Sequence, residues 1–224
     1  MSLKRVVALI PAFNEEKYIG ATVASLAALP EVNEIVVVDD ASTDRTAQLA
    51  AAAGARVISM PRNSGKGAAL NRGSADINAG VIMLLDGDLG ETAREARWLL
   101  EPVLAGQADM TVARFPPPRR KGGFGLVKGL ARKGIKFYTG LEMQSPLSGQ
   151  RVMTRQVMEK LLPFASGYGV EVGLTIKAVR AGFKVLEVPV QMTHAETGRD
   201  LKGFWHRGRQ FCHVALVLAR AAVK

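Results

Sequence analysis

Short apolar runs alternate with helix-like stretches through the first half of the chain, and this alternation limits the fold more than any other feature. Strand, helix and strand at this spacing are typical of a mostly parallel sheet with helices on both faces. We therefore predict an α/β fold. The expected strands are Val6–Ile10, Glu34–Val38, Arg56–Ser59, Val81–Leu85 and Met110–Ala113, and the expected helices are Glu15–Leu29, Thr43–Ala53, Lys66–Ala75 and Thr92–Leu104.

The pattern changes after the fifth strand. Phe115–Gly125 contains three prolines and three glycines, so we expect a loop there. The tail from Leu201 onward is predicted to be helical. The elements expected between them are the helix Leu126–Tyr138, the strand Ser148–Met153, the helices Gln156–Leu161 and Val170–Ala181, and the strand Lys184–Val190.

Helix-end signals agree with several of these boundaries. Asn14 and either Ser42 or Thr43 are predicted N-caps, because their short polar side chains can accept from the first turn of a helix. Gly54 follows an alanine-rich stretch and is predicted to end that helix.

The length suits one sizeable core. A chain of 224 residues, 48% of them hydrophobic, is too short for two comfortable domains. We expect a single domain over residues 1–224, with a nucleotide-binding half at 1–113 and an acceptor half at 114–224. Cys212 is the only cysteine, which fits a reducing compartment. With no signal-peptide pattern and no apolar run of about 18 residues, we expect a cytoplasmic protein.

Charge is divided unevenly between the two halves. Residues 1–105 hold 10 basic and 13 acidic residues, a net −3, and residues 106–224 hold 20 basic and 7 acidic, a net +13. An acidic half can hold a metal ion, and a basic half can meet an anionic partner such as a phosphate-bearing acceptor, a membrane surface or nucleic acid. A scattered basic surface is the simpler interpretation of the second half.

Polar or glycine-rich groups follow each of the first four expected strands. Ligands of parallel α/β sheets bind beyond the carboxyl ends of the strands, near the point where strand order reverses. Four such ends in register are therefore a candidate binding edge. They are Pro11–Glu16, Asp39–Asp44, Arg62–Gly67 and Asp86–Asp88.

Asp86-Gly87-Asp88 is the sharpest of these signals. Two carboxylates separated by glycine can reach one hard cation and leave room for diphosphate oxygens. We predict a Mg²⁺ or Mn²⁺ site that neutralises charge on a leaving nucleoside diphosphate. An ordinary surface turn is the alternative, since Asp and Gly also favour turns.

The other two strand ends offer contacts to a nucleotide. Asp40 can accept from a base or ribose, and the alternative for this acidic pair is a helix cap. Ser64–Gly67 lacks the spacing of a P-loop, yet Lys66 and Arg72 can approach a diphosphate.

Taken in order, these segments resemble the motifs of family 2 glycosyltransferases of the GT-A fold. The resemblance covers Pro11–Glu16, Val38–Asp44, Asn63–Gly73 and Leu85–Leu89. It implies a metal-dependent transferase that uses a nucleotide-sugar donor, a UDP- or GDP-hexose. The donor and its metal would be contacted by Pro11, Ala12, Phe13, Glu15, Asp40, Lys66, Asp86, Gly87 and Asp88.

The second half is similar to dolichyl- and polyprenyl-phosphate sugar synthases. Ala113-Arg114-Phe115 and Ser148-Gly149-Gln150-Arg151 look like two of their motifs. The resemblance implies that Arg114, Lys128 and Arg151 bind the acceptor phosphate. Lys128 would supply a point charge, without the bidentate hydrogen bonds that an arginine makes. Polyprenyl phosphate is thus the favoured acceptor.

Another stretch, Gly167–Glu171, resembles a motif of a second group of enzymes, the glucosyl-3-phosphoglycerate synthases. Among them a histidine placed like His194 helps to bind the metal, and imidazole suits Mn²⁺ better than Mg²⁺. A small phosphorylated acceptor is therefore the alternative. Glu171 could act as a base, orient sugar hydroxyls or only start a helix. With these relatives in mind, Asp88, Glu171 and Arg114 are the predicted catalytic residues.

Eight basic residues and no acidic residue lie between Met110 and Leu141. Such a basic, apolar stretch can rest on the inner face of an anionic membrane, or it can pack on the core with its charges in water.

Two other classes compete with a transferase. A nucleic-acid-binding protein would explain the basic half, but no helix-turn-helix, RNP or zinc pattern supports it. A sugar-nucleotide pyrophosphorylase would have a glycine-rich first loop, where this chain has Pro11–Glu16.

Overall fold

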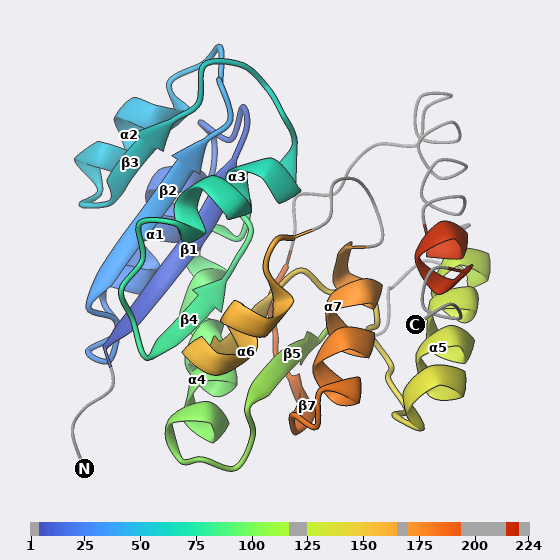
Figure 1. The fold of residues 1–224 in the computed structure, drawn as a ribbon. Helices are drawn as coiled ribbons and strands as arrows, with labels where there is room; N and C mark the ends of the chain where they lie inside the picture. The colour runs from blue at the N-terminus through green and yellow to red at the C-terminus, as the bar shows by residue number, and fades with distance from the viewer. Residues whose placement is uncertain (1–4, 117–124, 165–169, 194–213, 220–224) are drawn as a thin grey trace.

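The computed structural model describes residues 5–116, 125–164, 170–193 and 214–219. Helices cover both faces of one sheet of seven strands (Figure 1). The strands are β1 (Val6–Ala12), β2 (Glu34–Asp39), β3 (Arg56–Ser59), β4 (Val81–Leu84), β5 (Met110–Arg114), β6 (Arg151–Thr154) and β7 (Val185–Pro189). The helices are α1 (Ile19–Ala27), α2 (Thr46–Ala52), α3 (Lys66–Ser74), the 3₁₀ helix η1 (Gly90–Ala96), α4 (Arg97–Leu104), α5 (Gly125–Thr139), α6 (Arg155–Leu161) and α7 (Val170–Arg180).

The strand order is β3-β2-β1-β4-β6-β5-β7. Only β6 runs antiparallel to its neighbours β4 and β5, so the predicted mostly parallel sheet is confirmed. The chain moves outward from β1 to β3 and then crosses back to place β4 on the other side of β1. Strand order therefore reverses between β1 and β4, and this is where an α/β sheet binds its ligands.

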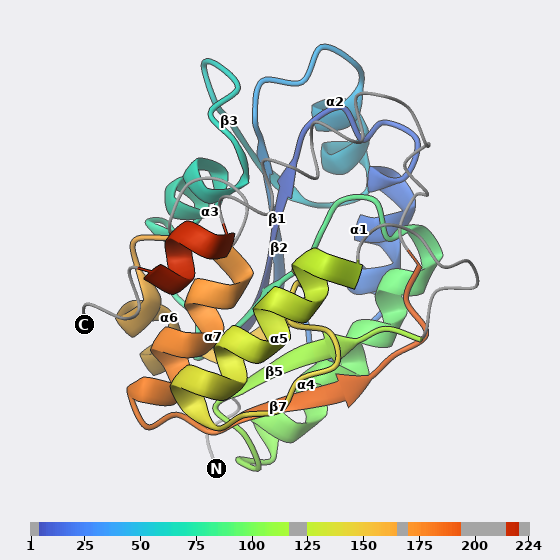
Figure 2. The ribbon, with the colours of Figure 1, turned by 90° about the vertical axis from the view of Figure 1, so that its right-hand side faces the viewer.

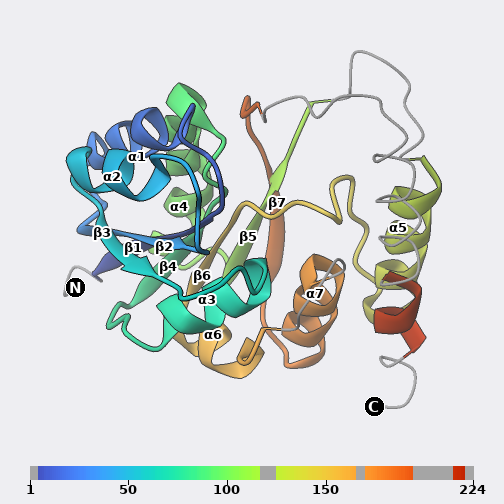
Figure 3. The ribbon, with the colours of Figure 1, turned by 90° about the horizontal axis from the view of Figure 1, so that it is seen from above.

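Two apolar layers fill the space between sheet and helices. On one face α1, α2, η1 and α4 pack through residues such as Ile19, Val23 and Leu99. On the other face α3, α6 and α7 pack, with α5 lying outside α7 (Figure 3). Alternating side chains of the strands serve the two layers, for example Val7 and Leu9 in one and Val6 and Ala8 in the other.

Helix α3 lies very close to the sheet because Gly73 faces β1 and β2. A Cβ atom at Gly73 would come within 2.4 Å of Leu9 Cδ1 and 2.8 Å of Val38 Cγ2. The close approach fixes the start of α3, and therefore Lys66, relative to the carboxyl ends of β1 and β2.

Residues 214–219 are helical and pack against α5 and α7 (Figure 2). The predicted helical tail is confirmed for these residues, and the remainder of the tail lies outside the described part of the chain. Within the described ranges, no helix is both long and apolar enough to cross a membrane.

Several predicted boundaries are wrong by a few residues. The first helix begins at Ile19 instead of Glu15, and the sixth strand begins at Arg151 instead of Ser148. The predicted helix Thr92–Leu104 is a 3₁₀ segment followed by α4. Gly54 does end α2, with φ of 100°.

Candidate active site

The loops after β1 and β2 are joined by side chains that the sequence suggested as helix caps. The amide of Asn14 donates to Ser42 Oγ at 2.9 Å, and Asn14 Oδ1 accepts from the amide of Thr43 at 2.9 Å. The N-cap prediction for Asn14, Ser42 and Thr43 is therefore wrong, since α1 and α2 start at Ile19 and Thr46 without a side-chain cap. These polar groups close one edge of the site.

The backbone at this edge is held in the left-handed region. Asn14 has φ of 56° and Ala41 has φ of 62°, which is unfavourable for a residue with a Cβ atom. Asn tolerates this region better than alanine does. The hydrogen bonds between the two loops offset part of that cost.

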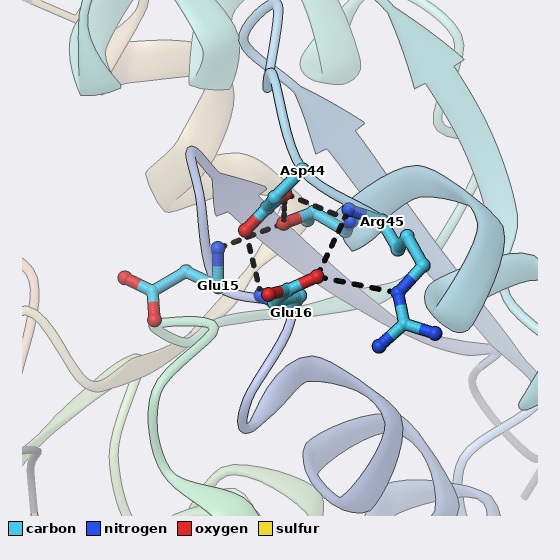
Figure 4. A network of polar contacts seen from close by, with 5 residues as sticks. Glu15, Glu16, Asp44 and Arg45 are labelled. Carbon is cyan, nitrogen blue, oxygen red and sulfur yellow. Dashed lines mark hydrogen bonds and ion pairs between the residues drawn. The ribbon is translucent and has the colours of Figure 1, made fainter.

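Glu15 follows Asn14, and its amide is also fixed by the second loop. The amide donates to the buried Thr46 hydroxyl at 2.7 Å, and the Glu15 side chain points away from the contacts among Glu16, Asp44 and Arg45 (Figure 4). Burial and, after it, the negative charges of Asp88, Asp86 and Asp44 together raise the pKa of Glu15 to about 7. The Glu15 carboxyl therefore lies in the field of the predicted metal ligands.

Asp86 lies just beyond β4 and is held from two sides. Its Oδ1 accepts from Lys66 Nζ at 2.6 Å, and its Oδ2 accepts from Gln150 Nε2 at 2.6 Å. Burial opposes the positive charge of Lys66, but the carboxylates of Asp86 and Glu171 outweigh it and raise the pKa of Lys66. Lys66 Nζ is also 3.7 Å from Glu171 Oε1. The start of α3, the Asp86 turn and α7 thus meet at the ammonium group of Lys66.

The turn of Asp86-Gly87-Asp88 is anchored from below by α1. The hydroxyl of Thr22 donates to Gly87 O at 2.9 Å and accepts from the amide of Gly90 at 2.8 Å. A Cβ atom at Gly87 would lie 3.4 Å from Glu15 Cγ, so the turn packs directly on the loop after β1. Asp88 is half-buried at the end of this turn.

Asp86 and Asp88 fit a hard divalent cation. Mg²⁺ is usually held by one or two carboxylates and completes its shell with water and substrate phosphates. Among the described residues, no group of three or more His, Cys, Asp or Glu side chains could hold a metal ion by itself. A cation held by Asp86 and Asp88 would leave positions in its shell for substrate phosphates. His194, the third predicted ligand, lies outside the described residues.

Asp40 is only 3% exposed, and both of its carboxylate oxygens hold the loop before α3. Oδ1 accepts from the amide of Ser64 at 2.8 Å, and Oδ2 accepts from the amide of Gly65 at 2.7 Å. A carboxylate has about four acceptor positions, so Asp40 can still accept hydrogen bonds from a ligand. The predicted contact of Asp40 with a nucleoside stays a prediction, as it does for Pro11, Ala12 and Phe13, which end β1 or follow it.

Arg114 ends β5 at the same edge of the sheet. Arg151 of β6 pairs with Leu84 of β4 on one side and with Val112 of β5 on the other. Because β4 and β5 run in the same direction, Asp86 and Arg114, two residues further along each, lie at the same level. Neighbouring strands are about 4.8 Å apart, which places the two backbones about 10 Å from each other. Lys128 lies on α5 and is half-buried. The predicted contacts of Arg114 and Lys128 with the acceptor stay predictions.

Arg151 lies in the interior beside the site, and its predicted contact with the acceptor stays a prediction. It is 0% exposed, and its guanidinium donates to Ser148 O, Thr175 Oγ1 and Glu171 O. Burial lowers the pKa of Arg151 to about 10, although Glu171 and Glu187 oppose that shift. The side chain ties the segment before β6 to the first turn of α7, which carries Glu171.

Three residues important to this geometry were not predicted: Thr22, Gly149 and Gln150. Thr22 carried no signal, because a threonine within a helical pattern is ordinary. Gly149 and Gln150 belong to a motif that was recognised, but only Arg151 was assigned a role. A Cβ atom at Gly149 would lie 2.6 Å from Lys66 Nζ and 3.1 Å from Asp86 Oδ2.

Comparisons with known proteins agree with this arrangement. The family model described as glycosyl transferase family 2 matches residues 7–162. Glucosyl-3-phosphoglycerate synthase of Mycobacterium tuberculosis H37Rv is 31% identical over 247 residues, which cover 98% of this chain and 74% of that protein. Polyprenol monophosphomannose synthase of Mycolicibacterium smegmatis is 32% identical over 221 residues, covering 87% of this chain and 80% of that protein.

A solved structure is similar over almost the whole chain. It is the glucosyl-3-phosphoglycerate synthase of M. tuberculosis in complex with Mn²⁺, uridine diphosphate and phosphoglyceric acid. The TM-score is 0.81 at 31% identity, and the match covers 97% of this chain and 78% of the other. The predicted GT-A fold is thereby confirmed.

Proposed function

The chain belongs to glycosyl transferase family 2, and we propose that it moves a hexose from a UDP- or GDP-sugar to a phosphate-bearing acceptor. The observation that carries this proposal is the pair Asp86 and Asp88 at the point where strand order reverses, beside Glu15. We treat residues 1–224 as one transferase domain. Residues 1–113 would hold the donor and residues 114–224 the acceptor.

The donor would lie across the carboxyl ends of β1, β2 and β4. Pro11, Ala12, Phe13 and Asp40 are placed to contact the nucleoside. Phe13 is 44% exposed, which is unusual for a phenylalanine and suits stacking or packing against a ligand. Lys66 would approach the diphosphate once the negative charges around it are shared with a cation.

Asp86 and Asp88 would hold Mg²⁺ or Mn²⁺, with His194 as a further ligand. When bound, the cation supplies positive charge to the diphosphate leaving group. Solved relatives with Mn²⁺ or Mg²⁺ and uridine diphosphate support this choice of metal. Asp88 belongs to the catalytic set because it would position both the cation and the diphosphate.

The acceptor-binding residues would mainly orient the acceptor, because a phosphate acceptor needs no strong base. A phosphate is already ionised near neutral pH, so Arg114 and Lys128 would hold it by charge. Glu171 lies in the first turn of α7 beside Lys66. It would orient sugar hydroxyls, or accept a proton if the acceptor group is a hydroxyl.

A small phosphorylated acid is one candidate acceptor. Relatives named for glucosyl-3-phosphoglycerate synthesis are 31% identical to this chain, and a similar solved structure holds phosphoglyceric acid. In this case transfer would go to a hydroxyl, and Glu171 would serve as the base.

Polyprenyl phosphate is the second candidate, and α5 favours it. Leu126 and Phe137 of this helix are 79% and 82% exposed, and Lys128, Arg132, Lys133 and Lys136 lie on the same helix. Apolar side chains among cations suit peripheral contact with an anionic membrane. The similarity to a polyprenol monophosphomannose synthase supports this acceptor as well.

A substrate panel tests the proposal. UDP- and GDP-hexoses are incubated with Mn²⁺, Mg²⁺ or EDTA, and with 3-phosphoglycerate, a short polyprenyl phosphate or neither. We expect metal-dependent release of nucleoside diphosphate from one donor, accelerated by one of the two acceptors. No release from any donor in the presence of metal would contradict the proposed function, and the preferred acceptor decides between the candidates.

A further inference from the structure

Gln150 lies where the donor and acceptor halves of the sheet meet. It is the last residue before β6, and its backbone oxygen accepts from the amide of Ala113 in β5 at 3.0 Å. The residue is 0% exposed. A fully buried glutamine needs partners for its amide group, because unpaired polar atoms are costly in the interior.

Both partners of the Gln150 side chain belong to Asp86. The side-chain Oε1 accepts from the backbone amide of Asp86 at 2.9 Å, and Nε2 donates to Asp86 Oδ2 at 2.6 Å. Because a backbone N–H can only donate, Oε1 must face it, and this fixes Nε2 toward the carboxylate. The two bonds define both the backbone position and the side-chain orientation of Asp86.

The rest of the carboxylate is constrained on its other side. Lys66 takes Oδ1, and Gly149 leaves just enough space for the Lys66–Asp86 pair. Each carboxylate oxygen accepts more than one bond, so a cation can still bind Asp86. The oxygens of Asp86 are therefore oriented before any ligand arrives.

Gln150 is itself held rigidly. The next residue, Arg151, is fixed by Ser148 O, Thr175 Oγ1 and Glu171 O, all within 3.1 Å. The segment before β6 is therefore attached to α7 on one side and to β5 on the other. This rigidity makes Gln150 a firm support for Asp86.

We propose that Gln150 is a positioning residue that presents Asp86 to the divalent cation. This inference rests on the proposed function, because it requires a cation at Asp86 and Asp88. Hydrogen-bond partners behind metal ligands typically change metal affinity by about 10–100-fold when they are removed. We expect an effect of this size on Mn²⁺ binding.

The test compares Gln150→Met with Thr111→Val. Methionine keeps the volume of glutamine and loses both bonds to Asp86. Thr111 is also 0% exposed, and its hydroxyl donates to Leu99 O of α4 at 2.7 Å. Both substitutions remove a buried hydrogen-bonding group, but only the first is next to Asp86. If Gln150→Met does not fold, Gln150→Asn, whose amide is one methylene shorter, replaces it.

Each protein is titrated with Mn²⁺ in the presence of UDP, and free Mn²⁺ is measured by electron paramagnetic resonance. Urea unfolding first establishes a temperature at which every variant is folded. Gln150→Met should weaken Mn²⁺ binding about 10–100-fold, and Thr111→Val should bind as wild type does. The Mn²⁺ concentration for half-maximal turnover should rise likewise for Gln150→Met, while turnover at saturating Mn²⁺ largely recovers.

Two results separate failure of this inference from failure of the proposed function. Equal Mn²⁺ affinity in wild type and Gln150→Met would overturn the positioning role and leave the metal site standing. A wild-type protein that takes up no Mn²⁺ with UDP would overturn the metal site, and the inference with it.

Discussion

At the scale of single residues, the site depends on negative charge concentrated at one turn. Asp86 is engaged by Lys66 and Gln150, and Asp88 lies half-buried at the end of the same turn. Burial and the charges of Asp88, Asp86 and Asp44 raise the pKa of Glu15 to about 7. A divalent cation bound to the two aspartates would relieve this repulsion.

Asp88→Ala should reduce donor turnover by at least about 100-fold, the usual cost of losing one electrostatic contact to a transition state. The unfolding midpoint should stay near that of wild type, because the side chain is half-buried in a surface turn. Steady-state kinetics and urea unfolding measure the two effects. Asp76→Ala, which removes an exposed carboxylate paired with Arg72, is the control and should keep full activity. Full activity of Asp88→Ala would remove Asp88 from the catalytic set.

Gly149→Ala should impair the site without adding or removing a charge. The new Cβ would come within 2.6 Å of Lys66 Nζ and 3.1 Å of Asp86 Oδ2, so the ion pair must move. We expect a higher KM for the donor, measured at saturating acceptor. Gly125→Ala is a matched control, because a Cβ there would meet nothing within 4 Å. An unchanged donor KM in Gly149→Ala would mean that the ion pair's position does not matter for binding.

At the scale of elements, the first three strands are clamped by one carboxylate. Glu34 at the start of β2 pairs with Arg56 of β3 at 2.6 Å and with Arg5, just before β1, at 2.7 Å. The bond from Arg56 is the main cause that lowers the pKa of Glu34, with Arg5 helping against partial burial. The carboxylate therefore stabilises the fold when it is ionised.

This pairing predicts a pH dependence of stability. A lowered folded-state pKa gives stability that is present above the unfolded value of 4.5 and is lost as pH falls through the folded pKa. The side chains of Arg5 and Arg56 are 55% and 40% exposed, so each pair contributes less than about 1 kcal/mol. Glu34→Gln should be slightly less stable at pH 7 and should lose less stability than wild type between pH 5 and 3. Urea unfolding across that range measures it; parallel curves would contradict the assignment.

Two glycines of α5 should respond to alanine in opposite ways. A Cβ at Gly129 would meet nothing within 4 Å, so Gly129→Ala should stabilise the protein by up to about 1 kcal/mol through helix propensity. A Cβ at Gly134 would come within 2.3 Å of Leu218 Cδ2, so Gly134→Ala should destabilise it. Thermal or urea unfolding compares them. Adding Leu218→Ala should remove the penalty at position 134; stabilisation by Gly134→Ala alone would show that residues 214–219 do not pack there.

At the scale of the whole molecule, the fold was largely predictable and the site only partly so. The strand Val81–Leu84 was predicted to within one residue, because a continuous apolar run is typical of a parallel strand that is buried on both faces. The residues that position the Asp86 turn, namely Thr22, Gly149 and Gln150, were not predicted. Thr22 and Asp86 are 64 positions apart, and only the folded chain brings α1 under the turn after β4. The orientation of β6, antiparallel between β4 and β5, likewise follows from tertiary packing and not from a local signal.

Membrane contact is also a property of the whole surface. Phe137 on α5 and Leu104 on α4 are both exposed, on opposite sides of the sheet. Sedimentation with vesicles of anionic lipid should be weakened several-fold by Phe137→Ser and by high salt, and left unchanged by Leu104→Ser. Neutral vesicles are the lipid control. Equal loss with both variants, or none, would contradict docking through α5.

The most direct test of the central claim is a crystal soaked with Mn²⁺ and UDP, examined by anomalous scattering. The account predicts a manganese peak in contact with the carboxylates of Asp86 and Asp88, with diphosphate oxygens completing its shell. Bound UDP with no metal at this turn, or a manganese ion held by other residues, would contradict it.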